Sequence, residues 1–175
     1  MNQIHISLGH NCNPRIYLKK TFNYSKSNGY KSCPFDLCIT PYSSLYDCIE
    51  TDFKYFFDHL TIIPWLNAEG KRLHYNNPNA ITNKYGMIFN HEGSGHSHLF
   101  NNGKNDDEYY TRDDFKIFKE KYSNRILNFR NYLNEHNEII FVYIEDNIYN
   151  GYDIQKLSDL FYKNYPNKKF SFIEL

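Results

Sequence analysis

The segment Glu138-Ile139-Ile140-Phe141-Val142-Tyr143-Ile144 gives the clearest secondary-structure signal in this chain of 175 residues. Its continuous apolar run, rich in β-branched and aromatic side chains, is typical of a strand that is buried on both faces. A helical apolar pattern follows at residues 154–161, and residues 169–175 form a second strand pattern. A strand, a helix and a strand in this order predict a right-handed crossover between parallel strands.

The rest of the chain adds further strands and helices to this unit. Strand patterns occur at residues 4–8 and 85–89, while helical patterns follow Pro14 and Pro41 and begin again near residue 111. The helix after Pro41 is expected to reach Phe57, and Thr111 with Asp114 resembles a capping box for the last helix. The remaining segments are predicted to be loops, namely residues 23–31, 60–84 and 91–103.

These elements predict an α/β fold, a sandwich in which helices flank a mostly parallel central sheet. The length is typical of a single domain, which we expect to comprise residues 1–175. Twenty basic and 20 acidic residues give a net charge of zero, which argues against a nucleic-acid partner. The bias toward Asn, Lys and Ile suggests an AT-rich bacterial or viral genome.

The cellular location and the redox state of the cysteines are inferred from the lack of targeting and membrane-spanning patterns in the sequence. Neither a signal peptide nor an apolar run long enough to span a membrane is evident, so we expect a soluble, cytoplasmic or otherwise intracellular protein. In that setting the four cysteines are expected to be reduced thiols.

Cys12 is the first candidate for chemistry, because it lies where the strand at residues 4–8 breaks at Gly9 and a helix begins. The unpaired N–H groups and the positive dipole of a helix start stabilise a thiolate and are expected to lower the pKa of the thiol. The alternative is a cysteine buried as a small hydrophobe.

His91 is the candidate base, since it ends the strand pattern at residues 85–89. If both strands are parallel in one sheet, Cys12 and His91 share the edge at which ligands bind. Glu145 or Asp146 could orient the histidine from the end of the next strand, and Asp36 is a further acid with turn stabilisation as its alternative role. Residues that flank the pair are expected to bind substrate, namely His10, Asn11, Asn90 and Glu92.

A zinc site is the alternative use of the histidines. His91, His96 and His98 lie within eight residues, and imidazoles are common zinc ligands. Neither a His-Glu-x-x-His motif nor paired Cys-x-x-Cys motifs accompany them, so solvated loop histidines are the favoured interpretation and no cofactor is expected.

Four stretches together resemble one known family. They are Ser7-Leu8-Gly9-His10-Asn11-Cys12, then Cys33-Pro34-Phe35-Asp36-Leu37 with Thr40-Pro41, then Asp52-Phe53, and finally Gly86-Met87-Ile88-Phe89-Asn90-His91. They are similar to an uncharacterised family labelled putative papain-like cysteine peptidases, whose members carry an S-L-G-x-x-C start, a P-F-D-W turn and an F-x-H strand end. The likeness runs over most of the chain. This sequence departs from the pattern at Leu37, where Trp is common, and at Glu92, where Asp often follows the histidine.

The resemblance implies a Cys12 nucleophile with a His91 base, and a papain-like α+β fold as the alternative to the α/β sandwich. Members of the family often occur beside or fused to glycan-building enzymes, so the substrate is either a peptide or related to glycans. The main hypothesis is therefore a cysteine hydrolase or acyl-transfer enzyme. The alternatives are a non-catalytic binding domain associated with glycan assembly and the zinc-binding protein.

Overall fold

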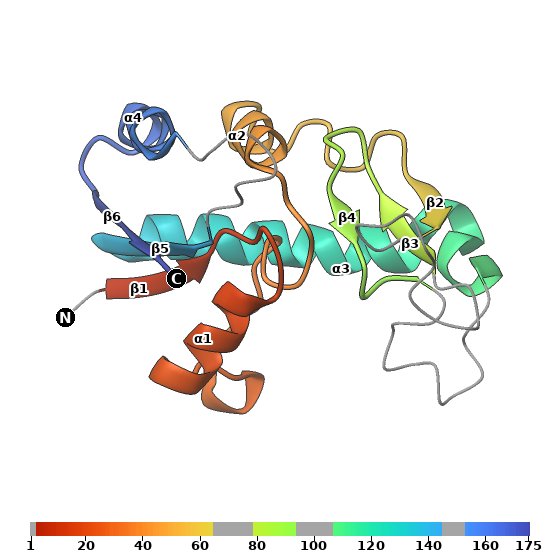
Figure 1. Cartoon of the computed structure of the whole chain (residues 1–175), viewed down its shortest axis with the longest axis horizontal. Coiled ribbons are helices and arrows are strands. Elements are labelled where there is room, and N and C mark those ends of the chain that lie inside the picture. The colour runs from red at the N-terminus through yellow and green to blue at the C-terminus, as the bar shows by residue number, and fades with distance from the viewer. Residues whose placement is uncertain (1–2, 65–78, 94–106, 145–152) are drawn as a thin grey trace.

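The computed structural model describes residues 3–64, 79–93, 107–144 and 153–175. Its first sheet has three parallel strands in the order β1 (Gln3–Ser7), β5 (Glu138–Tyr143) and β6 (Lys169–Glu174) (Figure 1). The central strand β5 is hydrogen-bonded on both sides, which agrees with its continuous apolar sequence. The two strands predicted around the last crossover are confirmed.

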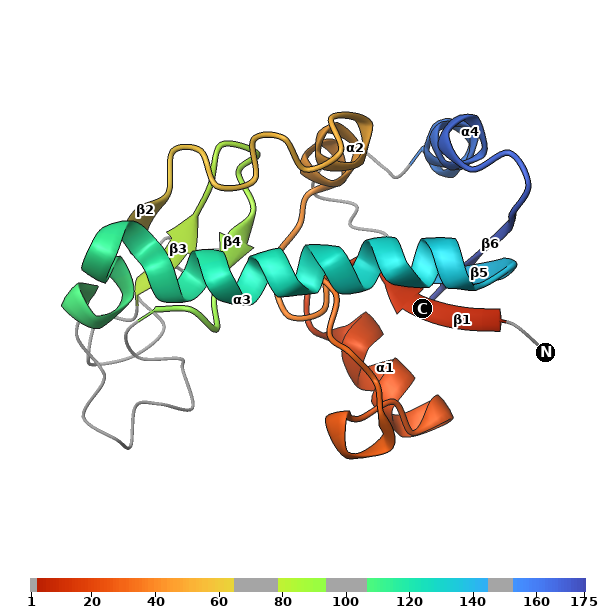
Figure 2. The same cartoon turned by 180° about the vertical axis from the view of Figure 1, so that it is seen from behind.

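Four α-helices surround these strands. They are α1 (Asn13–Phe22), α2 (Tyr42–Glu50), α3 (Asp107–Glu135) and α4 (Ile154–Asn164), and a short 3₁₀ helix η1 (Lys26–Asn28) follows α1. Helices α2 and α4 lie side by side on one side of the parallel sheet, and α1 lies on the other (Figures 1 and 2). The predicted α/β fold with flanking helices is therefore confirmed.

A second sheet was not predicted. Strands β2 (Thr61–Pro64), β3 (Asn79–Thr82) and β4 (Ile88–Phe89) pair antiparallel in that order. The prediction of a loop from residue 60 to residue 84 is wrong at β2 and β3, because each strand has only four residues, too few for a recognisable strand pattern, and is stabilised by pairing with its neighbour. The condition that β4 lies in the same parallel sheet as β1, under which Cys12 and His91 would share a sheet edge, is not met, because β4 pairs antiparallel with β3. The antiparallel strands that a papain-like α+β fold requires are present, but they form a sheet of their own.

Helix α2 ends earlier than predicted. The helical spacing continues to Phe57, but Asp52 and Phe53 have left-handed φ angles of 47° and 62°, and the helix stops at Glu50. Phe53 and Phe56 are still buried, so the apolar spacing reflects packing in the turns that follow the helix.

The capping box proposed for α3 does not form. The Thr111 hydroxyl donates to the Asp107 carbonyl at 3.1 Å, and residues 113–115 have φ angles of 51°, 56° and 59°, which interrupt the helix. After this interruption the predicted stripe faces the core as expected, with five buried side chains: Phe118, Tyr122, Ile126, Phe129 and Leu133.

Helix α3 also joins the two sheets through an aromatic cluster. The Phe89 ring of β4 lies 4.8 Å from the rings of both Phe118 and Tyr122, and Phe56 packs against Phe89 at 5.6 Å. Edge-to-face contacts of this kind add to the burial of the rings. They hold β4, and the residues that follow it, against the middle of the molecule.

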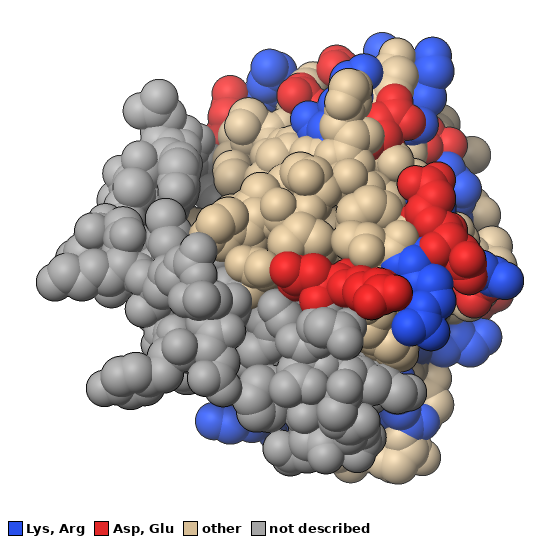
Figure 3. Space-filling model, turned by 90° about the vertical axis from the view of Figure 1, so that its right-hand side faces the viewer, with Lys and Arg blue, Asp and Glu red and all other residues tan. Residues whose placement is uncertain are grey.

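The surface carries both signs of charge. At the end of the molecule that bears β2 and β3, acidic and basic side chains lie next to each other (Figure 3), and Asp114 pairs there with Lys119. Within the described residues, no helix has the length and apolarity that crossing a membrane requires.

Candidate active site

Cys12 occupies the N-cap position of α1, directly after a tight reversal of the chain. Leu8 donates its N–H to the Val142 carbonyl at 2.9 Å, and Gly9 and His10 then take left-handed φ angles of 81° and 70°. A Cβ on Gly9 would lie 2.8 Å from the Thr40 hydroxyl oxygen, so both the backbone angle and the space require glycine. The turn therefore presents Cys12 at the carboxyl end of β1.

His91 lies in a turn that follows β4. The Glu92 N–H donates to the Phe89 carbonyl at 2.9 Å, and the buried Glu92 carboxylate pairs with Lys121 of α3. Gly93 lies so close to β3 that a Cβ would be 1.9 Å from the Asn79 carbonyl oxygen. The histidine is thus held between α3 and the antiparallel sheet.

The two side chains meet although their strands belong to different sheets. The Cys12 Sγ lies 3.2 Å from the His91 Nε2, and both residues are half-buried. The distance is within hydrogen-bond range for a thiol and an imidazole. The sequence thus predicted the neighbours, but the shared sheet edge from which they were predicted does not exist.

Burial and a hydrogen bond act on Cys12 in opposite directions. Burial raises the pKa of the thiol, and a hydrogen bond from the Asn90 side chain opposes the rise. The net direction is upward, opposite to the lowering that the helix start was expected to cause. Asn90 is itself buried, and among the described residues its Oδ1 atom has no hydrogen-bond partner.

Asp36 is fully buried and its contacts tie the preceding turn to α1. Its carboxylate accepts from the Cys33 N–H at 2.9 Å and the Tyr30 hydroxyl at 3.1 Å, and Arg15 Nε lies 3.4 Å away. Burial raises the pKa of Asp36 to about 6, against the opposing effect of Arg15. These partners are those expected of an acid that stabilises a turn.

The other predicted site residues have varied surroundings. Asn11 accepts the Asn13 N–H at 2.8 Å, and Glu92 is engaged by Lys121. His10 is half-buried next to Asn11. Four predicted residues lie outside the described part of the chain: Glu145, Asp146, His96 and His98.

The described ranges contain no group of three or more His, Cys, Asp or Glu side chains that could hold a metal ion. All four cysteines are free thiols, and the three besides Cys12 are buried.

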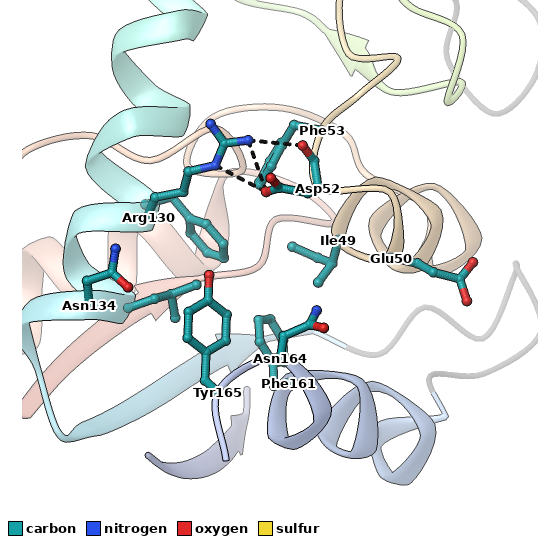
Figure 4. Close-up of a pocket in the computed structure, with 11 residues that line it drawn as sticks. Ile49, Glu50, Asp52, Phe53, Arg130, Asn134, Phe161, Asn164 and Tyr165 are labelled. Carbon is teal, nitrogen blue, oxygen red and sulfur yellow. Dashed lines mark hydrogen bonds and ion pairs between the residues drawn. The ribbon is translucent and has the colours of Figure 1, made fainter. Parts of the chain in front are cut away.

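A separate cavity of about 380 Å³ lies between the end of α2, α3 and α4 (Figure 4). Its described lining includes neither Cys12 nor His91. Arg130 closes one side by pairing with Asp52 at 3.0 Å, and Tyr165 and Phe161 contribute rings from α4 and the turn after it.

Comparison with known families provides the class of protein. A family model described as putative papain-like cysteine peptidase matches residues 3–169. The chain belongs to this family. The match spans both Cys12 and His91 as well as the turn that contains Asp36. No curated protein and no solved structure matches the chain.

Three cations near this site were missed in the sequence: Arg15, Lys121 and Arg125. Arg125 could have been found, since it follows Tyr122 by three residues and precedes Phe129 by four, on the apolar stripe of α3. It is 9% exposed, and a charged residue on a buried face indicates a specific partner. The sequence around Arg15 and Lys121 shows no comparable pattern, because neither residue lies on a predicted apolar stripe.

Proposed function

We propose that this member of the papain-like family is a cysteine hydrolase or acyl-transfer enzyme in which Cys12 is the nucleophile and His91 the general base. The observation that carries the proposal is the 3.2 Å separation of the Cys12 Sγ and the His91 Nε2. A base at hydrogen-bond distance from a thiol is the arrangement that nucleophilic catalysis requires. The family description favours a peptide substrate.

Burial raises the Cys12 pKa and so favours the protonated thiol before substrate binds. In the first step, Sγ attacks a carbonyl carbon while its proton moves to His91 Nε2. The new C–S bond forms, and the π electrons of the carbonyl move to its oxygen. The tetrahedral species then collapses, the bond to the leaving amine breaks, and His91 gives the amine its proton.

The product of this first half is a thioester on Cys12. His91 next takes a proton from water, or from an acceptor nucleophile in acyl transfer, as that nucleophile attacks the thioester. The second tetrahedral species expels the Cys12 sulfur, which regains a proton from His91. The acid or the transferred acyl product then leaves.

The start of α1 offers a donor for the oxyanion. The Asn13 N–H already donates to the Asn11 side chain, and Pro14 has no N–H. The Cys12 N–H is therefore the backbone donor that we assign to the developing charge, with the amide of Asn90 beside the sulfur as the side-chain donor.

The test is the rate of Cys12 alkylation by iodoacetamide at pH 7, with the modified residue located by peptide mass spectrometry. The other cysteines are buried, so Cys12 is the accessible thiol. His91→Asn removes the base, and we expect the rate to fall at least about tenfold. The matched control is His59→Asn at an exposed histidine. Equal rates in all three proteins would exclude a functional pair and favour the binding-domain alternative.

A further inference from the structure

Two neighbouring cavities form a basic groove beside α1. One, of about 330 Å³, lies between the segment around Lys26–Ser32 and α3, and the other, of about 350 Å³, lies between that segment and α1. They share Lys26 and Ser32. The described residues that line the two cavities include no Asp or Glu, but six cations: Arg15, Lys19, Lys26, Lys31, Lys121 and Arg125.

Nearby acids neutralise only part of this charge. Asp36 pairs with Arg15 and Glu92 pairs with Lys121. Among the described residues, Lys26 and Lys31 form no ion pair, and the Arg125 guanidinium donates to the Tyr122 hydroxyl at 3.0 Å instead of to a carboxylate. The groove therefore has a surplus of positive charge.

Like charges in the groove also affect one another. Burial lowers the pKa of Lys121, the Glu92 carboxylate opposes this, and Arg125 and Lys26 lower it further. An anion bound among these cations would relieve their repulsion. One Arg15 nitrogen, Nη1, is buried without a hydrogen-bond partner among the described residues, which leaves a donor unsatisfied beside the groove.

Neither Cys12 nor His91 lines the two cavities, but residues near each of them in the sequence connect the groove to the pair. Arg15 follows Cys12 by three residues on α1, a rise of about 4.5 Å along the helix axis. Lys121 pairs with Glu92, the residue after His91. A ligand whose anionic group lies in the groove would therefore reach the sulfur by extending along the start of α1.

We propose that this groove binds an anionic group of the substrate that carries two or more negative charges, and so positions the carbonyl attacked by Cys12. The positioning of a substrate rests on the proposed function, whereas the binding of an anion does not require Cys12. The chemistry that the groove recognises is shared by a phosphate ester or diphosphate and by a polycarboxylate.

The first test is calorimetric titration with pyrophosphate and, separately, with succinate. The proteins are the full chain with the native sequence, Cys12→Ala, the groove variant Lys26→Gln/Lys31→Gln, and the control Lys116→Gln/Lys163→Gln at two exposed lysines outside the groove. We expect the first two proteins and the control to bind alike, and the groove variant to bind at least about fivefold more weakly. The probe that binds more tightly identifies the source of the anion.

Equal affinity of the groove variant and the control, or no binding of either probe, would overturn the proposal. Cys12→Ala separates this result from the proposed function, because the variant lacks the nucleophile but retains every cation of the groove.

The second test compares alkylation of Cys12 by iodoacetate, which is anionic, with alkylation by neutral iodoacetamide. If the positive charge of the groove attracts anions to the Cys12 sulfur, Lys26→Gln/Lys31→Gln lowers the ratio of the iodoacetate rate to the iodoacetamide rate about threefold. The control variant leaves this ratio unchanged. An unchanged ratio in a groove variant that has lost pyrophosphate binding would mean that the anion does not lie at the nucleophile. A slow iodoacetamide reaction that is indifferent to His91 would contradict the proposed function alone.

Discussion

Cys12 is a residue on which burial and a neighbouring amide act in opposition. Burial raises the pKa of the thiol, and the hydrogen bond from Asn90 opposes the rise. His91 stands 3.2 Å from the sulfur and can take its proton when the thiolate is needed. In the proposed enzyme, the reactivity of Cys12 therefore depends on the base and on the amide more than on the helix start.

Replacing Asn90 tests the contribution of the amide. Asn90→Ala removes the hydrogen bond that favours the thiolate, so we expect the Cys12 pKa to rise further and alkylation at pH 7 to slow about threefold to tenfold. Stability should change little, because the substitution also removes a buried Oδ1 atom that has no partner among the described residues. Thermal unfolding checks this. The exposed Asn167→Ala is the control, and an unchanged rate in Asn90→Ala would contradict the assignment.

Asp36 makes stability depend on pH. Its pKa is about 6 in the folded protein and 3.8 in a model compound, so the folded state binds the proton more tightly and the protonated acid favours folding. This contribution is complete below about pH 4 and is lost as the pH rises through about 6. In Asp36→Asn this dependence disappears.

Urea unfolding at pH 4.5 and pH 7 measures the effect. We expect the free energy of unfolding of the native sequence, relative to Asp36→Asn, to fall by about 2 kcal/mol between these two pH values. Asp36→Asn also leaves Arg15 without its carboxylate partner, so the variant is expected to be less stable than the native sequence at both pH values. A relative stability that stays constant or rises with pH would contradict the raised pKa.

At the scale of elements, the turn after β4 holds the base against two neighbours. Glu92 ties the turn to α3 through Lys121, and Gly93 brings it against the backbone of β3. The spacing of apolar residues predicted a strand that contains β4 and the histidine that follows it, His91. The same spacing could not predict the antiparallel pairing, because β3 and β4 have four and two residues, which are too few positions for a hydrophobic period to be recognised.

Gly93→Ala is expected to displace this turn. A Cβ would overlap the Asn79 carbonyl oxygen at 1.9 Å, and that backbone atom belongs to a paired strand. We expect a loss of about 3 kcal/mol in the free energy of unfolding, together with the loss of the His91 effect on Cys12 alkylation. Gly29→Ala is the control for a Cβ that meets no neighbour: its φ of 83° disfavours alanine, but its Cβ would have nothing within 4 Å. Gly29→Ala should lower the free energy of unfolding by about 1 kcal/mol. Similar losses in the two variants would show that the close approach does not matter.

At the scale of the whole molecule, α3 and its aromatic side chains hold two sheets together. The sequence analysis predicted a single, mostly parallel sheet and did not distinguish these two. Residues 138–144 and 169–175 have the long apolar patterns from which parallel strands can be recognised, and both strands were predicted. The meeting of Cys12 with His91 depends on Phe89 packing against Phe118 and Tyr122, which is a tertiary contact without a local signal. The groove depends in the same way on cations from α1, α3 and the segment from η1 to Ser32.

The most direct test of the Cys12–His91 pair is the rate of Cys12 alkylation by iodoacetamide from pH 5 to pH 10, in the native sequence and in His91→Asn. A coupled thiol and imidazole lose two protons in two steps that belong to the pair. The native sequence should therefore show a first rise to a plateau below pH 8 and a second rise at alkaline pH, whereas His91→Asn should show the alkaline rise alone. Identical single-step profiles would mean that His91 does not act on the sulfur, and the proposed enzyme would have no base.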